Sequence, residues 1–315
     1  MTSMTFRPRT ILRLAAFLLG ALAACSPQAA LADAAAAKAL IPTEAPSAAV
    51  SATSAPAAQP SATPLPTPLP DTWQTAPIIP ESLSQRARDT YALGRALGRN
   101  PRAFSKVGDC GGTPAWFLGP FDLGDYKLGD YSSLQEVIDF YSGSYNRTSK
   151  AVHNGFNAAS ILSSIRADPE FCESGEHPLG CEFRLNNPSL ALIMVGTNDK
   201  YRVAEFEGAM RLIIEYSIDQ GILPVIASKP DNLEGDHSLN RILYALALEY
   251  ELPFWNLWGA MQDLPNGGLQ EDGAHLVWAP NDFSNVVDMR AGWPNRNLSA
   301  LQVLDSIWSQ LENDD

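Results

Sequence analysis

The chain has 315 residues and a formal net charge of −13, with 22 Lys and Arg against 35 Asp and Glu. It contains no run of basic residues, which argues against nucleic acid as a partner. Beyond the first 25 residues, no apolar run approaches the ~20 residues that a membrane helix needs.

The first 25 residues are typical of an export signal. Arg7, Arg9 and Arg13 lie before or near the start of an apolar stretch over residues 11–24, and Cys25 follows this stretch in the sequence LAAC. Small residues before a cysteine resemble the bacterial lipobox, in which the cysteine is lipidated and begins the mature protein. A plain signal peptide that happens to contain a cysteine is the alternative. We therefore expect an exported protein of the bacterial cell envelope, which contacts the membrane only through a lipid on Cys25.

Residues 26–71 are almost entirely Ala, Pro, Ser and Thr. Such a segment cannot bury a core, and its prolines favour an extended conformation, so a disordered linker is expected. Residues 72–315 remain, and they are enough for one domain with a large core. Without residues 1–25 the formal charge changes from −13 to −16, because that segment holds three arginines and no acidic residue.

Strand-like and helix-like segments alternate along residues 72–315. Helices are expected over residues 82–98, 133–143, 202–221 and 237–251, and from 297 to 311 with an Asn or Ser cap. Buried strands are expected at 103–109, 189–199, 222–230 and 252–258, and residues 151–162 form a short run broken by Asn-Gly. This alternation predicts a parallel sheet covered on both faces, with the ligand beyond the carboxyl ends of the strands.

Four cysteines are present, and Cys25 belongs to the lipobox. Cys172 and Cys181 flank a polar loop, CESGEHPLGC, which in an exported protein indicates a local disulfide. Cys110 is then left over, although its pairing with Cys172 or Cys181 stays open from sequence. No metal-type spacing occurs and the four histidines are scattered, so we expect neither a metal site nor a cofactor.

Four short stretches carry residues suited to chemistry. In chain order they read VGDC at 107–110, HNGFN at 153–157, VGTND at 195–199 and DGAHL at 272–276. This order resembles that of the SGNH (GDSL-type) hydrolases, whose marks are a Gly-Asp-Ser turn, a glycine, a Gly-x-Asn-Asp element and an Asp-x-x-His near the C-terminus. The resemblance runs from about residue 103 to the end. It departs from the family at the nucleophile, where Cys110 replaces serine.

The resemblance implies a flavodoxin-like three-layer α/β sandwich with a central parallel sheet, and an ester-cleaving site. Cys110 stands at the position of the nucleophile, and His275 can act as its general base. Asp272, three residues earlier, is close enough to orient the ring. The backbone N–H groups of Cys110 and Gly155 and the side chain of Asn198 would form the oxyanion hole.

Each of these stretches also has a plain structural interpretation. Asn-Gly at Gly155 is typical of a turn, Asn198 and the residue after it are typical of a helix cap, and Asp272 can begin a turn that leaves His275 at the surface. Four such features in family order favour the catalytic interpretation.

The other candidates are less specific. Trp116, Trp278 and Trp293 follow three of the four stretches and would either stack on sugar rings or pack in the core and rim. His237 lies in a loop beyond a strand, where it would contact substrate or merely precede a helix capped by Asp236 or Ser238. It is left out of the triad, and His153 and His177 are taken as ordinary loop residues.

A thiol at the nucleophile position is chemically competent. A thiolate is a better intrinsic nucleophile than a hydroxyl, but the larger sulfur displaces the attacking atom and an exported thiol is open to oxidation. We expect a monomeric ester hydrolase, either an esterase or a carbohydrate O-deacetylase, acting on a small-molecule or polysaccharide ester. The alternatives are a non-catalytic lipoprotein that binds a glycan or another ligand, an acyltransferase, and a purely structural Cys110.

Overall fold

The computed structural model describes residues 72–312. The expected signal segment, the lipobox with Cys25 and the linker at 26–71 lie outside these residues. Within them, no helix combines the length and the apolar character needed to cross a membrane.

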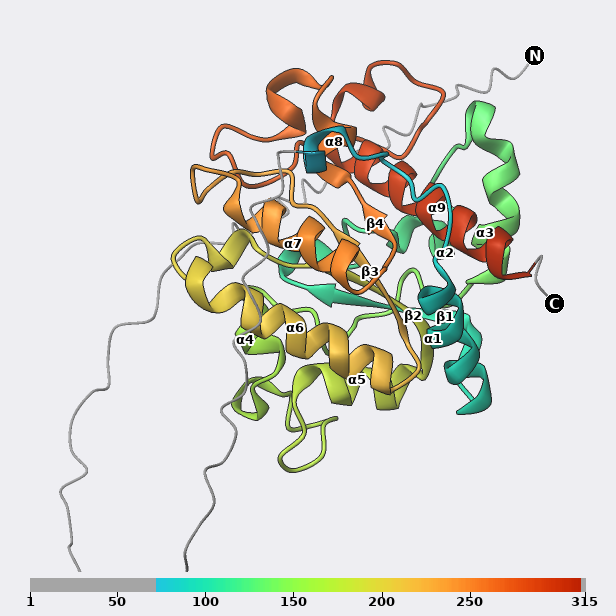
Figure 1. Ribbon diagram of the computed structural model, residues 1–315. Coiled ribbons are helices and arrows are strands. Elements are labelled where there is room, and N and C mark those ends of the chain that lie inside the picture. Colours follow the sequence, from blue (N-terminus) through green and yellow to red (C-terminus); the bar gives the residue numbers. More distant parts are fainter. Residues whose placement is uncertain (1–71, 313–315) are drawn as a thin grey trace, which may run out of the picture. The chain divides into compact units, whose positions relative to one another are not determined.

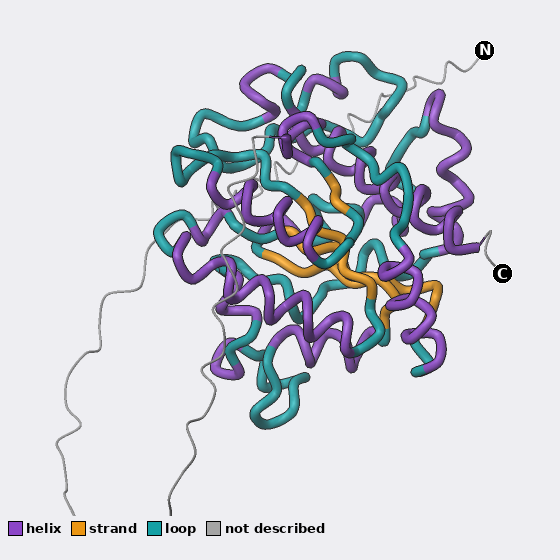
Figure 2. The backbone as a smooth tube through the Cα atoms, viewed as in Figure 1, coloured by secondary structure: helices purple, strands orange, loops and turns teal. Residues whose placement is uncertain are grey.

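The core of the described residues is a parallel sheet with strand order β1-β2-β3-β4. Figure 2 shows the strands gathered at the centre, surrounded by helices and loops. The middle strands are buried along their whole length, as expected for a sheet covered on both faces. The strands are β1 (Asn100–Gly108), β2 (Pro188–Met194), β3 (Leu223–Ala227) and β4 (Phe254–Trp255).

A single bridge extends the sheet beyond β1. Val152 pairs in parallel with Gly108, on the edge of β1 that faces away from β2. The Gly108 N–H donates to the Ala151 carbonyl at 3.0 Å, and the His153 N–H donates to the Gly108 carbonyl at 3.4 Å. Counting this position as a strand gives the order 2-1-3-4-5, which is that of flavodoxin-like sheets. The expected fold class is therefore confirmed.

Helices cover both faces of the sheet. Figure 1 shows α6 and α7 on one side, and α9 with α3 on the other. The helices are α1 (Gln85–Ala96), α2 (Gly119–Leu123), α3 (Gln135–Phe140), α4 (Ala158–Ile161), α5 (Pro178–Asn186), α6 (Val203–Asp219), α7 (Ser238–Glu249), α8 (Leu257–Met261) and α9 (Gly292–Glu312). Short 3₁₀ turns include η1 (Thr72–Thr75), η2 (Cys110–Gly112), η3 (Gly129–Leu134), η4 (Ser164–Arg166), η5 (Thr197–Asp199), η6 (Pro265–Gly268) and η7 (Asp288–Arg290).

Two helix boundaries differ from the sequence prediction. The last helix begins at Gly292 rather than at 297, because Pro294 fits within a first helical turn, where its missing N–H is not needed. Asn297 is therefore not a cap. It is buried inside the helix, where its side chain accepts the Leu118 N–H and donates to the Trp116 carbonyl, each at 3.0 Å. The helix expected at 133–143 is divided between η3 and α3.

A buried carboxylate joins α5 to β1. Glu182 is fully buried, and its Oε1 accepts the Ser105 hydroxyl at 2.6 Å and forms an ion pair with Arg147. Its Oε2 accepts the Lys150 N–H at 2.8 Å. Removing one partner of a buried ion pair leaves the other charge uncompensated, which costs far more than losing an exposed pair.

We therefore expect Glu182→Ala to lower the free energy of unfolding by about 3–5 kcal/mol. The matched control is Glu207→Ala in α6, which removes an exposed ion pair with Arg211 and should cost less than about 1 kcal/mol. Urea denaturation of both variants measures the difference. Equal losses in the two variants would contradict a structural role for Glu182.

Candidate active site

The carboxyl ends of three strands bring the polar segments to one edge of the sheet. Gly108 pairs with Met194, and one residue earlier in β2 Ile193 pairs with Ile226 of β3. The segments that follow these strands carry Cys110, Asn198 and Asp231. The sheet register thus places the sequence-predicted strand ends side by side.

The turn that carries Cys110 is built by the residue before it. The Asp109 carboxylate accepts the Gly111 N–H at 2.8 Å and caps the 3₁₀ turn, while its carbonyl accepts the Gly112 N–H at 3.0 Å. Glycine is required here, because a side chain on Gly112 would come within 2.7 Å of Val152. Cys110 itself is half-buried.

The segment with Gly155 pairs with the end of β1 at Val152 and contacts the loop after β2 at Phe156. Asn198 donates from Nδ2 to the carbonyl of Phe156 at 2.9 Å. The Nδ2 group carries a second hydrogen, and the Asn198 side chain is exposed. Gly155 has φ of +78°, and within residues 72–312 its N–H donates to no other protein group. Two of the expected oxyanion donors therefore occupy neighbouring positions.

His275 and Asp272 form a local pair. The ring Nδ1 lies 2.5 Å from Asp272 Oδ2, and Asp272 Oδ1 accepts the backbone N–H groups of Ala274 and His275 at 3.0 Å. A hydrogen bond from Nδ1–H to the carboxylate leaves Nε2 as the basic nitrogen. Burial acts to raise the pKa of Asp272, but the bonds from the ring and the two N–H groups outweigh it and lower the pKa to about 2.

The electrostatics of Asp109 indicate which groups meet at the sheet edge. Burial raises its pKa, and the Gly111 N–H and the positive charge of Arg296 act against burial. The charge of Asp231 also acts on Asp109. So does the charge of His275, which therefore acts on the residue before Cys110.

Asp199, next to Asn198, is a second acid of this edge. It is almost fully buried and both of its oxygens lie 3.2 Å from the Ala158 N–H. Burial raises the pKa of Asp199 to about 7, the Ala158 N–H opposes this, and the charge of Asp109 adds to it. In the plain interpretation this segment was a helix cap, and the observed role is to hold the loop before α4.

The charged side chains of the loop after β3 pair with one another. Lys229 Nζ lies 2.7 Å from Asp231 Oδ1 and 2.5 Å from Glu234 Oε2, and all three side chains are buried. Asp231 Oδ2 accepts the Thr197 hydroxyl at 2.7 Å. The Thr197–Asp231 bond therefore ties the loops after β2 and β3 together.

The remaining histidines have structural surroundings. The His237 ring packs against Trp73 and Trp258, with ring centroids 5.3 and 5.8 Å away, and the two tryptophan rings also contact each other. His177 caps α5, since its Nδ1 accepts the Gly180 N–H at 3.0 Å. His153 is exposed and packs on Phe156.

The three tryptophans divide into two kinds. Trp293 is half-buried, stacks on Trp116 with ring centroids 6.3 Å apart and covers the Arg296 guanidinium. The backbone N–H of Trp293 donates to the carbonyl of Val277, the residue before Trp278. Trp116 and Trp278 are exposed. Trp293 therefore packs the rim, and the other two rings are open to solvent beside it.

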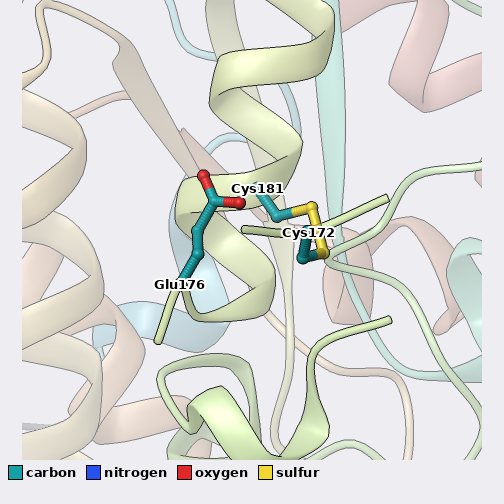
Figure 3. Close-up of side chains that lie close together, drawn as sticks. All are labelled: Cys172, Glu176 and Cys181. Atoms are coloured by element: carbon teal, nitrogen blue, oxygen red, sulfur yellow. A yellow bond between two sulfur atoms is a disulfide. The ribbon is translucent and has the colours of Figure 1, made fainter. Parts of the chain in front are cut away.

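The disulfide joins Cys172 and Cys181, and Figure 3 shows it beside Glu176 at the start of α5. The pairing of Cys110 with either of them, left open by sequence, is excluded. The three side chains in Figure 3 lie close enough together to suggest a metal site. The two sulfurs are bonded to each other, however, so no thiolate ligand is available there. Glu176 forms an ion pair with Arg184.

Comparison with known proteins gives little. No protein-family model and no curated protein matches the chain. A solved structure of a GDSL-like lipase from Bacteroides thetaiotaomicron is similar over 73% of this chain and all of that chain, with 16% identity and a TM-score of 0.41. So weak a likeness carries no argument about activity. The site rests on its own geometry.

The sequence did not single out Arg296, which lies in α9 and acts on Asp109. A lone arginine in a helix is ordinarily a surface residue. The available signal was its spacing, because Arg296 stands four and seven residues before the buried Ala300 and Val303, on the same helix face.

Asp199 gives a test of the buried acids. A carboxyl with a raised pKa holds a proton in the folded chain that the unfolded chain has released, so its contribution to stability is complete below the unfolded pKa of 3.8 and is lost as the pH rises through about 7. We expect Asp199→Asn to be more stable than the wild type at pH 8, by up to about 4 kcal/mol, with little difference at pH 4. Urea denaturation at both pH values measures this. The same difference at both would show that Asp199 titrates normally.

Proposed function

We propose that the chain is an ester hydrolase in which Cys110 is the nucleophile, His275 the general base and Asp272 the group that orients the base. The observation that carries this proposal is the bond from His275 Nδ1 to Asp272, together with the action of His275 on the charge of Asp109. This bond leaves Nε2 as the basic nitrogen, and we assign that nitrogen to the deprotonation of Cys110. A purely structural histidine would not need this arrangement.

The first half of the reaction forms an acyl-enzyme. Cys110 Sγ attacks the carbonyl carbon of the ester, and His275 Nε2 holds the proton of the thiol, which it has taken either before the attack or during it. The tetrahedral oxyanion would be held by the N–H groups of Cys110 and Gly155 and by the exposed amide of Asn198. The C–O bond then breaks, the alcohol leaves with the proton from His275, and a thioester remains.

Water completes the cycle. His275 removes a proton from water, and the resulting hydroxide attacks the thioester carbonyl. The C–S bond breaks, the carboxylic acid is released, and Cys110 regains its proton. The same thioester would transfer its acyl group to an alcohol if water were excluded.

We further propose that this site acts outside the cytoplasmic membrane, on a lipid-anchored protein whose linker at 26–71 spaces it from the surface. The composition of residues 1–71 supports this proposal. For the substrate we propose an acetyl ester on a small molecule or a polysaccharide. The exposed Trp116 and Trp278 beside the site support the polysaccharide, since aromatic rings offer apolar faces with polar edges.

The first test is hydrolysis of p-nitrophenyl acetate by the full-length chain. Cys110→Ala and His275→Ala should each lower kcat/KM by about 10³-fold or more, because the triad members act as a unit. Mass spectrometry of the quenched reaction should detect an acetyl group on the peptide that contains Cys110. Retention of wild-type rates in Cys110→Ala would contradict the proposal.

Cys110→Ser separates the alternatives. A silent wild type with an active serine variant would indicate an esterase pocket in which the natural thiol suppresses hydrolysis, in favour of binding or of another acyl acceptor. Silence of every folded variant would favour the non-catalytic binding protein.

Asp272→Asn tests the orienting role. The amide can donate to Nδ1 and so favours the wrong ring tautomer, and kcat should fall by about 10²–10⁴-fold. Because its pKa is about 2, Asp272 stays ionised from pH 4 to 9 and contributes no limb to a wild-type pH profile in that range. An unchanged kcat in Asp272→Asn would show that the pair is only a surface turn.

A further inference from the structure

Arg296 is a buried arginine to which the reaction above assigns no role. It is only 7% exposed, and its guanidinium carbon lies 4.6 Å from the ring centroid of Phe117 and 5.2 Å from that of Trp293. Nη2 contacts the sulfur of Met194 at 3.1 Å, and Nε has no hydrogen-bond partner among the described residues. A guanidinium buried among rings and a thioether is costly unless negative charge lies near it.

The negative charge comes from the Cys110 turn. A Cβ atom on Gly111 would lie 2.8 Å from Arg296 Nη1 and 3.1 Å from Asp109 Oδ1, so the guanidinium is close against the backbone directly after Cys110. Burial lowers the pKa of Arg296 to about 10, while the charges of Asp109 and Cys110 both act to raise it.

Such an interaction is reciprocal. A thiolate that stabilises a nearby guanidinium is stabilised by that guanidinium to the same extent. Water screens the pair little, because Arg296 is buried.

We propose that Arg296 stabilises the thiolate form of Cys110, so that the site holds a charged nucleophile before substrate binds. The role of this charge in catalysis rests on the proposed function, in which Cys110 attacks the ester. Arg296 is a positioning residue here, since it acts through Cys110 and not on the substrate.

The other charged groups at this edge set the balance. Asp109 competes with the thiolate for Arg296. The charge of Asp231 acts to raise the pKa of Asp109, and the charge of Asp109 acts to raise that of Asp199. Lys229 is already engaged by Asp231 and by Glu234. His275 is the second source of positive charge, so a test has to separate Arg296 from it.

The experiment measures alkylation of Cys110 by iodoacetamide between pH 5 and 9.5 on the full-length chain. The thiolate displaces iodide and becomes a thioether, and mass spectrometry of the Cys110 peptide gives the rate without interference from other cysteines. The rate at high pH reports access to the sulfur, whereas the midpoint pH reports thiolate stability. A merely structural role for Arg296 would change the rate at high pH and not the midpoint pH.

In Arg296→Met, which removes the charge from a side chain of similar length, we expect alkylation at pH 6.5 to be roughly 10-fold slower or more. The reason is that a nearby opposite charge typically shifts a pKa by about one unit or more. Arg296→Lys keeps the charge and should stay close to the wild type. Asp109→Asn keeps the cap but removes the competitor, and should be alkylated faster than the wild type at pH 6.5.

An unchanged midpoint in a folded Arg296→Met variant would overturn the proposal, as would a lysine variant that behaves like the methionine variant. If Arg296→Met does not fold, Arg296→Gln decides, because it also removes the charge and an unchanged midpoint there overturns the proposal equally. The midpoint of His275→Ala, measured in parallel, gives the part of the thiolate stabilisation that depends on the histidine. Alkylation needs no ester, so loss of the Arg296 effect and absence of ester hydrolysis are separate results.

Discussion

The packing of β1 between its two neighbours at Gly108 fixes the position of the reactive groups. A side chain at Gly108 would come within 2.3 Å of the Met194 carbonyl oxygen, and the backbone of the same residue bonds to positions 151 and 153 on its other edge. Gly112, at the end of the Cys110 turn, in turn lies against Val152. The nucleophile turn and the segment that leads to Gly155 therefore cannot move independently. Preorganised oxyanion donors depend on this kind of rigidity, because they stabilise the transition state only when they need not rearrange.

The same close packing gathers acids at one edge of the sheet. Burial raises the pKa of both Asp109 and Asp199, and each acts unfavourably on acids around it. The fold offsets this with two buried cations, Lys229 on the side of β3 and Arg296 in α9. Acids with raised pKa values and paired buried charges are more frequent at functional sites than elsewhere. This makes the edge a candidate site independently of any family resemblance.

Local pattern was enough to predict the sheet and the His275–Asp272 pair. The continuous apolar run of β2 indicated a strand buried on both faces, and a spacing of three residues allowed the ring to reach the carboxylate. The start of α9 was missed because Gly292 and Pro294 together are typical of a turn, whereas the proline fits the first helical turn. The assignment of His275 to the Cys110 turn concerns segments far apart in the sequence, which no local pattern relates, and only the resemblance suggested it.

Arg296 bears on the choice between a thiol and a hydroxyl at position 110. A serine hydroxyl is not ionised at neutral pH, so it would give the buried guanidinium no charge to pair with, and Asp109 alone would offset the burial of Arg296. A thiol ionises close to neutral pH. The turn can then present two anions, the Asp109 carboxylate and the Cys110 thiolate, to the Arg296 guanidinium. The presence of Arg296 thus makes a cysteine electrostatically better suited to this turn than a serine. The larger sulfur hinders the reaction only if the oxyanion donors at Gly155 and Asn198 are positioned for an oxygen nucleophile. The positions of these donors follow from the packing at Gly108 rather than from the residue at 110.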